Sequence, residues 1–225
     1  ASDVYKRQNK CSVKRKKCLR YATICSNAGF LGNPIAQGVF GMMGLTLASI
    51  YLIPQRIMMW SEGVSVFTEA PTKKEMLKKI FTHPCIIACE IGIVLMLTGW
   101  RPPHFLEETI TSVSNCNTAM SMLVIGMILA DADPKTIIDK DVLFYTFIRL
   151  LIIPFCVFIP CWLLHTDSLV MGVSVILAAM PAGATTTILA SKYDCEEEFS
   201  VKLVVFSTAA SLITTPLWNM ILLKF

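Results

Sequence analysis

The chain has 225 residues, of which 54% are hydrophobic and 16% are charged, and its formal net charge is +4. Soluble domains carry a charge on about a quarter of their residues, so this composition excludes an ordinary soluble protein and indicates a polytopic membrane protein. The net charge is too small to indicate a nucleic-acid partner, and we expect none.

The first residues, ASDVYKRQNK, contain neither a Met nor the apolar region of a signal peptide. The stretch SDVYKRQ resembles translated sequencing adapter. We therefore interpret residues 1 to about 9 as foreign and the chain as truncated at its N-terminus. With the basic run Lys14–Lys17 and Arg20, residues 1–21 are expected to form a non-native end followed by a cytoplasmic basic loop.

Seven apolar segments are long enough, or nearly long enough, to cross a hydrocarbon core, which needs about 20 residues. They are expected at residues 22–41, 43–60, 84–100, 109–130, 142–164, 168–190 and 200–223. The first two should be joined by a short turn near Gly41 and Gly44. The predicted fold class is all-α: a polytopic transmembrane helical bundle.

Lysine and arginine are distributed unequally between the loops. From Lys10 onward, fourteen lie in loops on one side of the predicted spans, and only Arg101 and Lys224 lie on the other. Because loops rich in positive charge stay in the cytoplasm, that side is predicted to be cytoplasmic. Residues 61–83 form a cytoplasmic linker, in which PTKKEMLKKIF is either a surface amphipathic helix or a solvated connection.

Two spans contain residues that interrupt helices. The segment SNAGFLGNPI carries Asn27, Gly32, Asn33 and Pro34, and the segment AAMPAGATTT carries Pro181 and Gly183. A proline inside a helix costs about 3 kcal/mol, and lipid cannot satisfy the backbone groups that a break exposes. The two spans run in opposite directions, which is the pattern of inverted repeats whose discontinuous helices meet near the membrane midplane.

Such a meeting point can bind an anion, because the N-terminal ends of helices carry partial positive charge. The residues expected to bind a ligand are Asn27, Gly32, Asn33, Pro34, Asn115, Asn117, Pro181, Gly183, Thr185 and Thr186. For Asn115 and Asn117 there is an alternative interpretation, in which their side chains form hydrogen bonds between packed helices.

The apolar segments also contain ionisable residues. Glu90 is a candidate proton carrier, a partner for Arg149, or a protonated side chain that the structure tolerates. Arg56 and Arg149 are near enough to the ends of their spans for the side chains to extend toward water.

Catalytic and metal-binding motifs are missing from the sequence. It contains no HExxH or GxSxG motif, and its histidines, His83, His104 and His165, all fall at the ends of spans. We therefore expect no catalytic residue, no metal site and no cofactor. An intramembrane enzyme is the less favoured alternative.

Three stretches carry a family resemblance: SNAGFLGNPI, TAMSMLVIGMILA and AAMPAGATTTILASKYDCEEEFSVKLVVFSTAASLITTPLW. They resemble the auxin efflux carrier family, which includes bacterial malate and malonate permeases. The resemblance covers residues 22–223 and implies ten spans in two inverted five-helix repeats, with crossed broken helices as the fourth and ninth. About seven spans would be present: the last two of the first repeat in residues 22–60, and the second repeat in residues 84–225. The breaks would lie at Asn33–Pro34 and Pro181–Gly183.

The resemblance also implies a function. It indicates a secondary transporter that moves a small organic carboxylate, such as malate or malonate, across a bacterial plasma membrane by alternating access. The expected partners are this anion, the lipid bilayer and, if the protein is a homodimer, a second copy. A transporter-derived sensor that binds its ligand without carrying it is the alternative.

Overall fold

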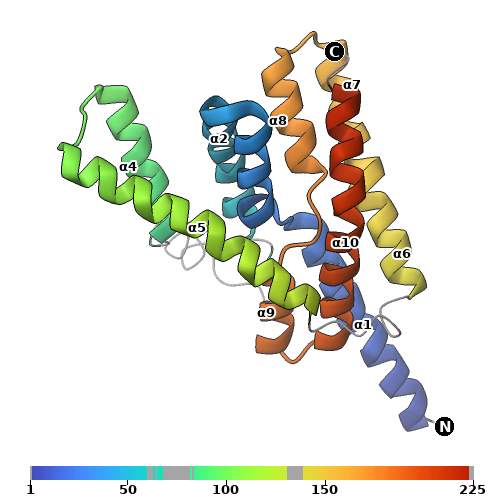
Figure 1. Ribbon diagram of the computed structural model, residues 1–225. Coiled ribbons are helices and arrows are strands. Elements are labelled where there is room, and N and C mark those ends of the chain that lie inside the picture. The colour runs from blue at the N-terminus through green and yellow to red at the C-terminus, as the bar shows by residue number, and fades with distance from the viewer. Residues whose placement is uncertain are drawn as a thin grey trace.

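The computed structural model describes residues 2–59, 63, 65–67, 82, 84–130 and 139–222. Every regular element in these ranges is a helix, which confirms the predicted fold class (Figure 1). The elements are α1 (Ser2–Ile24), η1 (Ala28–Gly32), α2 (Asn33–Met58), α4 (Pro84–Thr98), α5 (His104–Ala130), α6 (Lys140–Phe147), η3 (Ile148–Ile152), α7 (Ile153–Leu163), α8 (Ser168–Ala178), α9 (Thr185–Lys192) and α10 (Glu197–Leu222).

Among the described residues, three helical stretches are long and apolar enough to cross a membrane: Ala28–Met58, Lys140–Leu163 and Glu197–Leu222. The first of them reverses at Gly41, whose φ of 67° lies in the left-handed region that favours glycine. Helix α2 therefore consists of two arms, residues 33–40 and 42–58. The turn lies where the sequence predicts it.

Two helices are interrupted, and their breaks meet. Helix α1 ends at Ile24 and η1 begins at Ala28, whereas α8 ends at Ala178 and α9 begins at Thr185. Ser26 and Ala182 form an antiparallel bridge, so the two breaks cross each other. Each interrupted helix is followed by a further long helix, the second arm of α2 in one case and α10 in the other. The crossed discontinuous helices that the sequence predicts are thus present.

The position of the first break differs from the prediction. Asn33–Pro34 is not a break, because η1 continues directly into α2 and Pro34 occupies one of the first positions of α2. Pro34 has no N–H to donate to the preceding turn, and that turn is the π-helical turn η1. Residues 2–24 form α1, the first half of this interrupted helix, so the basic segment expected as a loop within residues 1–21 is helical.

Apolar side chains pack in two clusters, one for each pair of half-helices. The first cluster joins η1 and α2 to α8 and the C-terminal part of α10, with Leu31, Leu52, Ile176 and Trp218 among its buried members. The second joins α1, α6 and α9 to the N-terminal part of α10. In Figure 1, α4 and the start of α5 extend away from this body, whereas α5 then runs back toward it and contacts η1 and α10.

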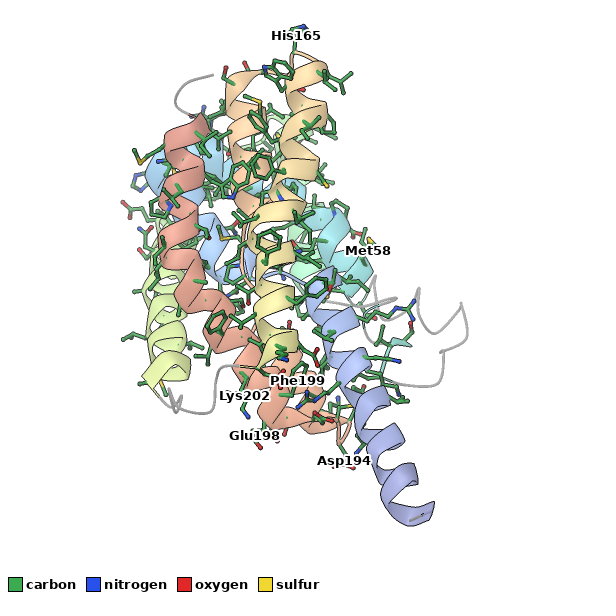
Figure 2. The ribbon with its side chains drawn as sticks, turned by 90° about the vertical axis from the view of Figure 1, so that its right-hand side faces the viewer. Met58, His165, Asp194, Glu198, Phe199 and Lys202 are labelled. Atoms are coloured by element: carbon green, nitrogen blue, oxygen red, sulfur yellow. The ribbon has the colours of Figure 1, made fainter. Side chains whose placement is uncertain are left out.

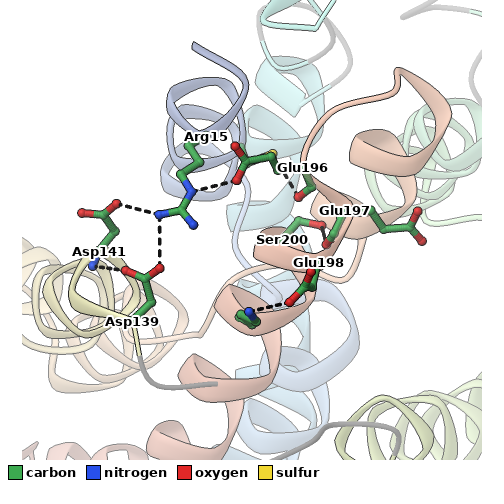
Figure 3. A network of polar contacts seen from close by, with 9 residues as sticks. Arg15, Asp139, Asp141, Glu196, Glu197, Glu198 and Ser200 are labelled. Carbon is green, nitrogen blue, oxygen red and sulfur yellow. Dashed lines mark hydrogen bonds and ion pairs between the residues drawn. The ribbon is translucent and has the colours of Figure 1, made fainter. Parts of the chain in front are cut away.

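Charged residues gather at one end of the molecule. Figure 2 places Asp194, Glu198 and Lys202 at the end opposite to His165, as the predicted alternation of loops requires. At the charged end, Arg15 of α1 contacts three carboxylates (Figure 3). Its guanidinium lies 2.7 Å from Glu196, 3.1 Å from Asp139 and 3.4 Å from Asp141. This network joins α1 to the start of α6 and to the connection between α9 and α10. The 71–81 segment predicted as an amphipathic helix lies outside the described residues.

Candidate binding site at the crossing

The two breaks satisfy each other's backbone groups. The Asn27 N–H donates to the Pro181 carbonyl at 2.8 Å, and the Gly183 N–H donates to the Cys25 carbonyl at 3.1 Å. The approach is so close that a Cβ atom at position 183 would lie 3.2 Å from the Cys25 oxygen. A side chain at position 183 would therefore require the two backbones to move apart by a few tenths of an ångström. Pairing between the breaks explains how irregular backbone is tolerated inside an apolar bundle.

Side chains from the neighbouring helices complete this pairing. The Ser207 hydroxyl of α10 accepts a hydrogen bond from the Ala182 N–H at 3.1 Å. The Gln55 amide of α2 donates to the Ser26 carbonyl and hydroxyl oxygens at 3.0 and 2.9 Å. Each break thus has one polar side chain from the long helix that follows it.

Arg149 lies at the C-terminal ends of both first half-helices. Its Nε donates to the Met180 carbonyl at 2.9 Å, and its Nη1 donates to the Thr23 carbonyl at 3.2 Å. Only 5% of Arg149 is exposed, so its side chain does not extend toward water as expected. The hydroxyl of Tyr145, one turn earlier, donates to the Ala22 carbonyl at 2.8 Å. These side chains satisfy carbonyls that a helix end leaves unpaired.

The N-terminal ends of the second half-helices face a pocket instead. The pocket is small and open, with a volume of about 60 Å³ counted as the space that the centres of water-sized molecules can occupy. It is lined by Ser26, Asn27, Gly29, Phe30, Leu52, Gln55, Arg56, Met59, Gly183, Ala184 and Thr185. Neither η1 nor α9 has a side chain capping its first turn. Two helix ends with partial positive charge therefore border one pocket.

Arg56 adds a full positive charge to this pocket. Its guanidinium lies beside the first turn of η1, because a Cβ atom at Gly29 would be 3.5 Å from the Arg56 Nη2. No carboxylate in the described part of the chain forms an ion pair with Arg56. Beside it, the Gln55 Oε1 is buried and has no hydrogen-bond partner. The pocket therefore combines a positive charge that pairs with no carboxylate of the described residues and an acceptor without a partner.

The structure brings together some of the predicted ligand-binding residues. Asn27, Gly183 and Thr185 line the pocket, and Pro181 accepts the hydrogen bond from Asn27. Thr186 is fully buried, and its hydroxyl has no partner. These residues meet because the breaks cross.

Other predicted residues lie outside the pocket lining. Gly32 is buried, and a Cβ atom there would lie 2.6 Å from the Leu177 side chain. Asn33 and Pro34 lie partly buried in the continuous helix beyond the break. Asn115 is exposed on α5, and the side chain of Asn117 is outside the described set.

Glu90 is exposed on α4. The expected partnership with Arg149 is not formed among the described residues, because the guanidinium of Arg149 donates to two carbonyl groups.

Sequence reasoning missed Ser26, Gln55, Arg56, Tyr145 and Arg149 as site residues. The available signal was the position of two arginines within apolar segments, since intramembrane charges often mark a functional site. Their nearness to the ends of the predicted spans favoured the simpler interpretation. Only the fold shows that the crossing lies beside them.

Known proteins resemble this chain over most of its length. A family model described as membrane transport protein matches residues 9–219. An uncharacterized transporter of Methanothermobacter thermautotrophicus is 27% identical over 206 residues, which are 91% of this chain and 67% of that protein. The uncharacterized transporter MJ1031 of Methanocaldococcus jannaschii is 24% identical, over 90% of this chain and 67% of its own length. The uncharacterized transporter YfdV of Escherichia coli K12 is 21% identical, over 84% and 63%. The chain thus spans about two thirds of the length of these relatives.

Proposed function

The chain belongs to this family of membrane transport proteins, the auxin efflux carrier family that its motifs indicated, and we propose that it carries a small organic carboxylate across the cell membrane. The observation that supports this substrate class is the pocket at the crossing. Two helix N-terminal ends and the Arg56 guanidinium border it, and all three favour a negative charge.

Each part of the pocket has a defined role in this proposal. A carboxylate lies against the N-terminal ends of η1 and α9, beside Asn27 and Thr185. In α9, the N–H groups of Thr186 and Thr187 already donate to the Gly183 and Ala184 carbonyls, so this end acts mainly through its partial charge. Arg56 pairs with this group or with a second carboxylate on the same molecule. The buried Gln55 Oε1 accepts a hydrogen bond from a substrate hydroxyl or from water, since an unpaired buried acceptor is costly.

Transport by alternating access needs a site that both sides of the membrane reach in turn. The crossing suits such a site because each interrupted helix has one half on either side of it. The half-helices are separate elements, so access from each side is governed by a different pair of them: α1 with α9, and α8 with η1 and α2. This is the arrangement of transporters with discontinuous helices at the midplane.

The test is uptake of radiolabelled malonate into liposomes that contain the full-length protein. We expect saturable uptake, and we expect Arg56→Met to raise the KM about ten-fold or more, because a hydrogen-bonded charge pair contributes about 1.5–3 kcal/mol. The matched control is Arg101→Met, since Arg101 is exposed in the connection between α4 and α5.

Two results would contradict the proposal. Saturable malonate binding without uptake would favour the sensor. Equal KM values for Arg56→Met and Arg101→Met would remove Arg56 from the site.

A further inference from the structure

Arg149 occupies an unusual position in its helix. It belongs to η3, the π-helical turn Ile148–Ile152 between α6 and α7. Pro154 follows in the first turn of α7 and has no N–H to donate to the Leu150 carbonyl, which accepts instead from the Trp218 Nε1 at 2.9 Å. Turns of this π-helical kind are rare in proteins, and those that occur often lie at functional sites. The local sequence thus produces an irregular turn at the residue that reaches the crossing.

The partners of Arg149 are two helix ends rather than an acid. Its guanidinium donates to the carbonyls of Thr23, in the last turn of α1, and of Met180, two residues after the end of α8. Each of these ends carries partial negative charge, and no carboxylate of the described residues forms an ion pair with Arg149. A buried cation is stable only with such compensation. The two ends and the guanidinium therefore form one charge-balanced cluster.

The same contacts connect Arg149 to the pocket, although it is not among the lining residues. Thr23 lies four residues before Asn27, and Met180 lies five residues before Thr185. Both connecting segments are short, and each is held to the other by the hydrogen bonds at Asn27 and Gly183. A shift of either half-helix end would therefore move the N–H groups that border the pocket.

We propose that Arg149 is a positioning residue of the substrate site, which clamps the Thr23 and Met180 carbonyls and so fixes the helix N-termini that face the pocket. The inference rests on the proposed function for its effect on binding, but its effect on the crossing is independent of any substrate. Arg149 differs from Arg56 in acting through the backbone. Its loss must weaken ligands of different charge equally, whereas loss of Arg56 must weaken the more highly charged ligand most.

The first measurement is hydrogen–deuterium exchange of the full-length protein in nanodiscs. We expect Arg149→Met to increase exchange in segments 25–28 and 181–184, with a smaller increase in Arg149→Lys. Lysine keeps the charge but lacks the fork that reaches two carbonyls. Arg101→Met is the matched control, and Tyr145→Phe removes a neighbouring hydrogen bond to α1 without a change of charge. The proposal would be overturned if both Arg149 variants showed the same exchange at the crossing as the control. If Arg149→Met increases exchange throughout the protein, the result for Arg149→Lys is used instead.

The second measurement is the affinity for malonate, a dianion, and for its monoamide, a monoanion. We expect Arg149→Lys to weaken both by the same factor, about three- to ten-fold, as for the loss of one typical net hydrogen bond, because lysine retains the charge. A decrease confined to malonate in Arg149→Met, which removes the charge that Arg149→Lys keeps, would overturn the positioning role and make Arg149 a direct counter-charge. Unchanged affinities beside increased exchange would also overturn it. If the unsubstituted protein binds neither compound, the proposed substrate class fails, and the exchange result still decides whether Arg149 fixes the crossing.

Discussion

The two breaks at the crossing differ in sequence although they do the same task. The second break, residues 179–184, contains Pro181 and Gly183 and separates two helices that would otherwise be one apolar span. The first break, residues 25–27, contains Cys25, Ser26 and Asn27, none of which is a strong helix breaker. It is stable because the other break and the Gln55 side chain supply its hydrogen bonds. One break is thus encoded locally, and the other depends on tertiary contacts.

The largest effect is expected where the two backbones are closest. In Gly183→Val, the added side chain would meet the Cys25 and Ser26 carbonyl oxygens, which are 3.2 and 3.3 Å from a Cβ at that position. Overpacking of this kind costs about 1–3 kcal/mol, so we expect malonate affinity to fall roughly 10- to 100-fold. The control is Gly38→Val, because nothing lies within 4 Å of a Cβ at position 38. Equal affinities for the two variants would show that the breaks separate without loss of the site.

Substitution of the two prolines tests the comparison directly. Pro181→Ala restores an N–H in the second break and lets the helix continue, which withdraws the carbonyl that accepts from Asn27. We expect uptake to fall about ten-fold, whereas Pro34→Ala, at the start of α2, should change it less than about two-fold. Initial rates of uptake measured at equal protein content decide this. A larger effect at Pro34 than at Pro181 would indicate that the functional break of the first helix lies at Asn33–Pro34, as the sequence predicts.

This comparison also shows which parts of the fold the sequence could predict. The helical class, the turn at Gly41 and the break at Pro181–Gly183 follow from apolar length and from glycine and proline, which act locally. The first half-helix, α1, could not be found in this way. Its basic residues Lys14–Lys17 and Arg20 are typical of a solvated loop between spans. Its helical structure is supported by buried residues such as Cys18, Tyr21 and Cys25, which pack against α6, α9 and α10.

The site was predictable to a similar extent. Asn27, Gly183 and Thr185 were chosen because they lie near helix breaks, and the structure places all three at the pocket. Arg56 and Arg149 could not be assigned, because their roles depend on which carbonyls and helix ends lie next to them. Those neighbours come from segments up to 126 residues away, as in the bond from Arg149 to Thr23.

The polar side chains that support the breaks should have separable roles. Ser207→Ala leaves the Ala182 N–H buried without its partner, so we expect a loss of about 1–3 kcal/mol in stability and little change in affinity. Gln55→Leu also removes a pocket-lining group, so it should raise the KM as well as lower the melting temperature. Thermal unfolding in detergent, combined with binding of malonate, separates these effects. Similar affinity losses in both variants would mean that Ser207 also shapes the pocket.

The smallest effect is expected at the charged end of α1, where Arg15 contacts three carboxylates. Helix α8 has no such network. It begins instead with an N-cap, in which the Asp167 carboxylate accepts a hydrogen bond from the Leu169 N–H at 2.9 Å.

The Arg15 side chain is 36% exposed, so water and salt weaken these contacts, and Arg15→Gln should cost only about 1 kcal/mol. Thermal unfolding at low and high salt measures this, with the exposed Lys16→Gln as control. The difference between the variants should shrink at high salt, since the carboxylates then gain less from the guanidinium. If Arg15→Gln unfolds with the control at low salt, the packing of Tyr21 and Cys25 alone holds α1 in place, and the first break depends entirely on contacts near the crossing.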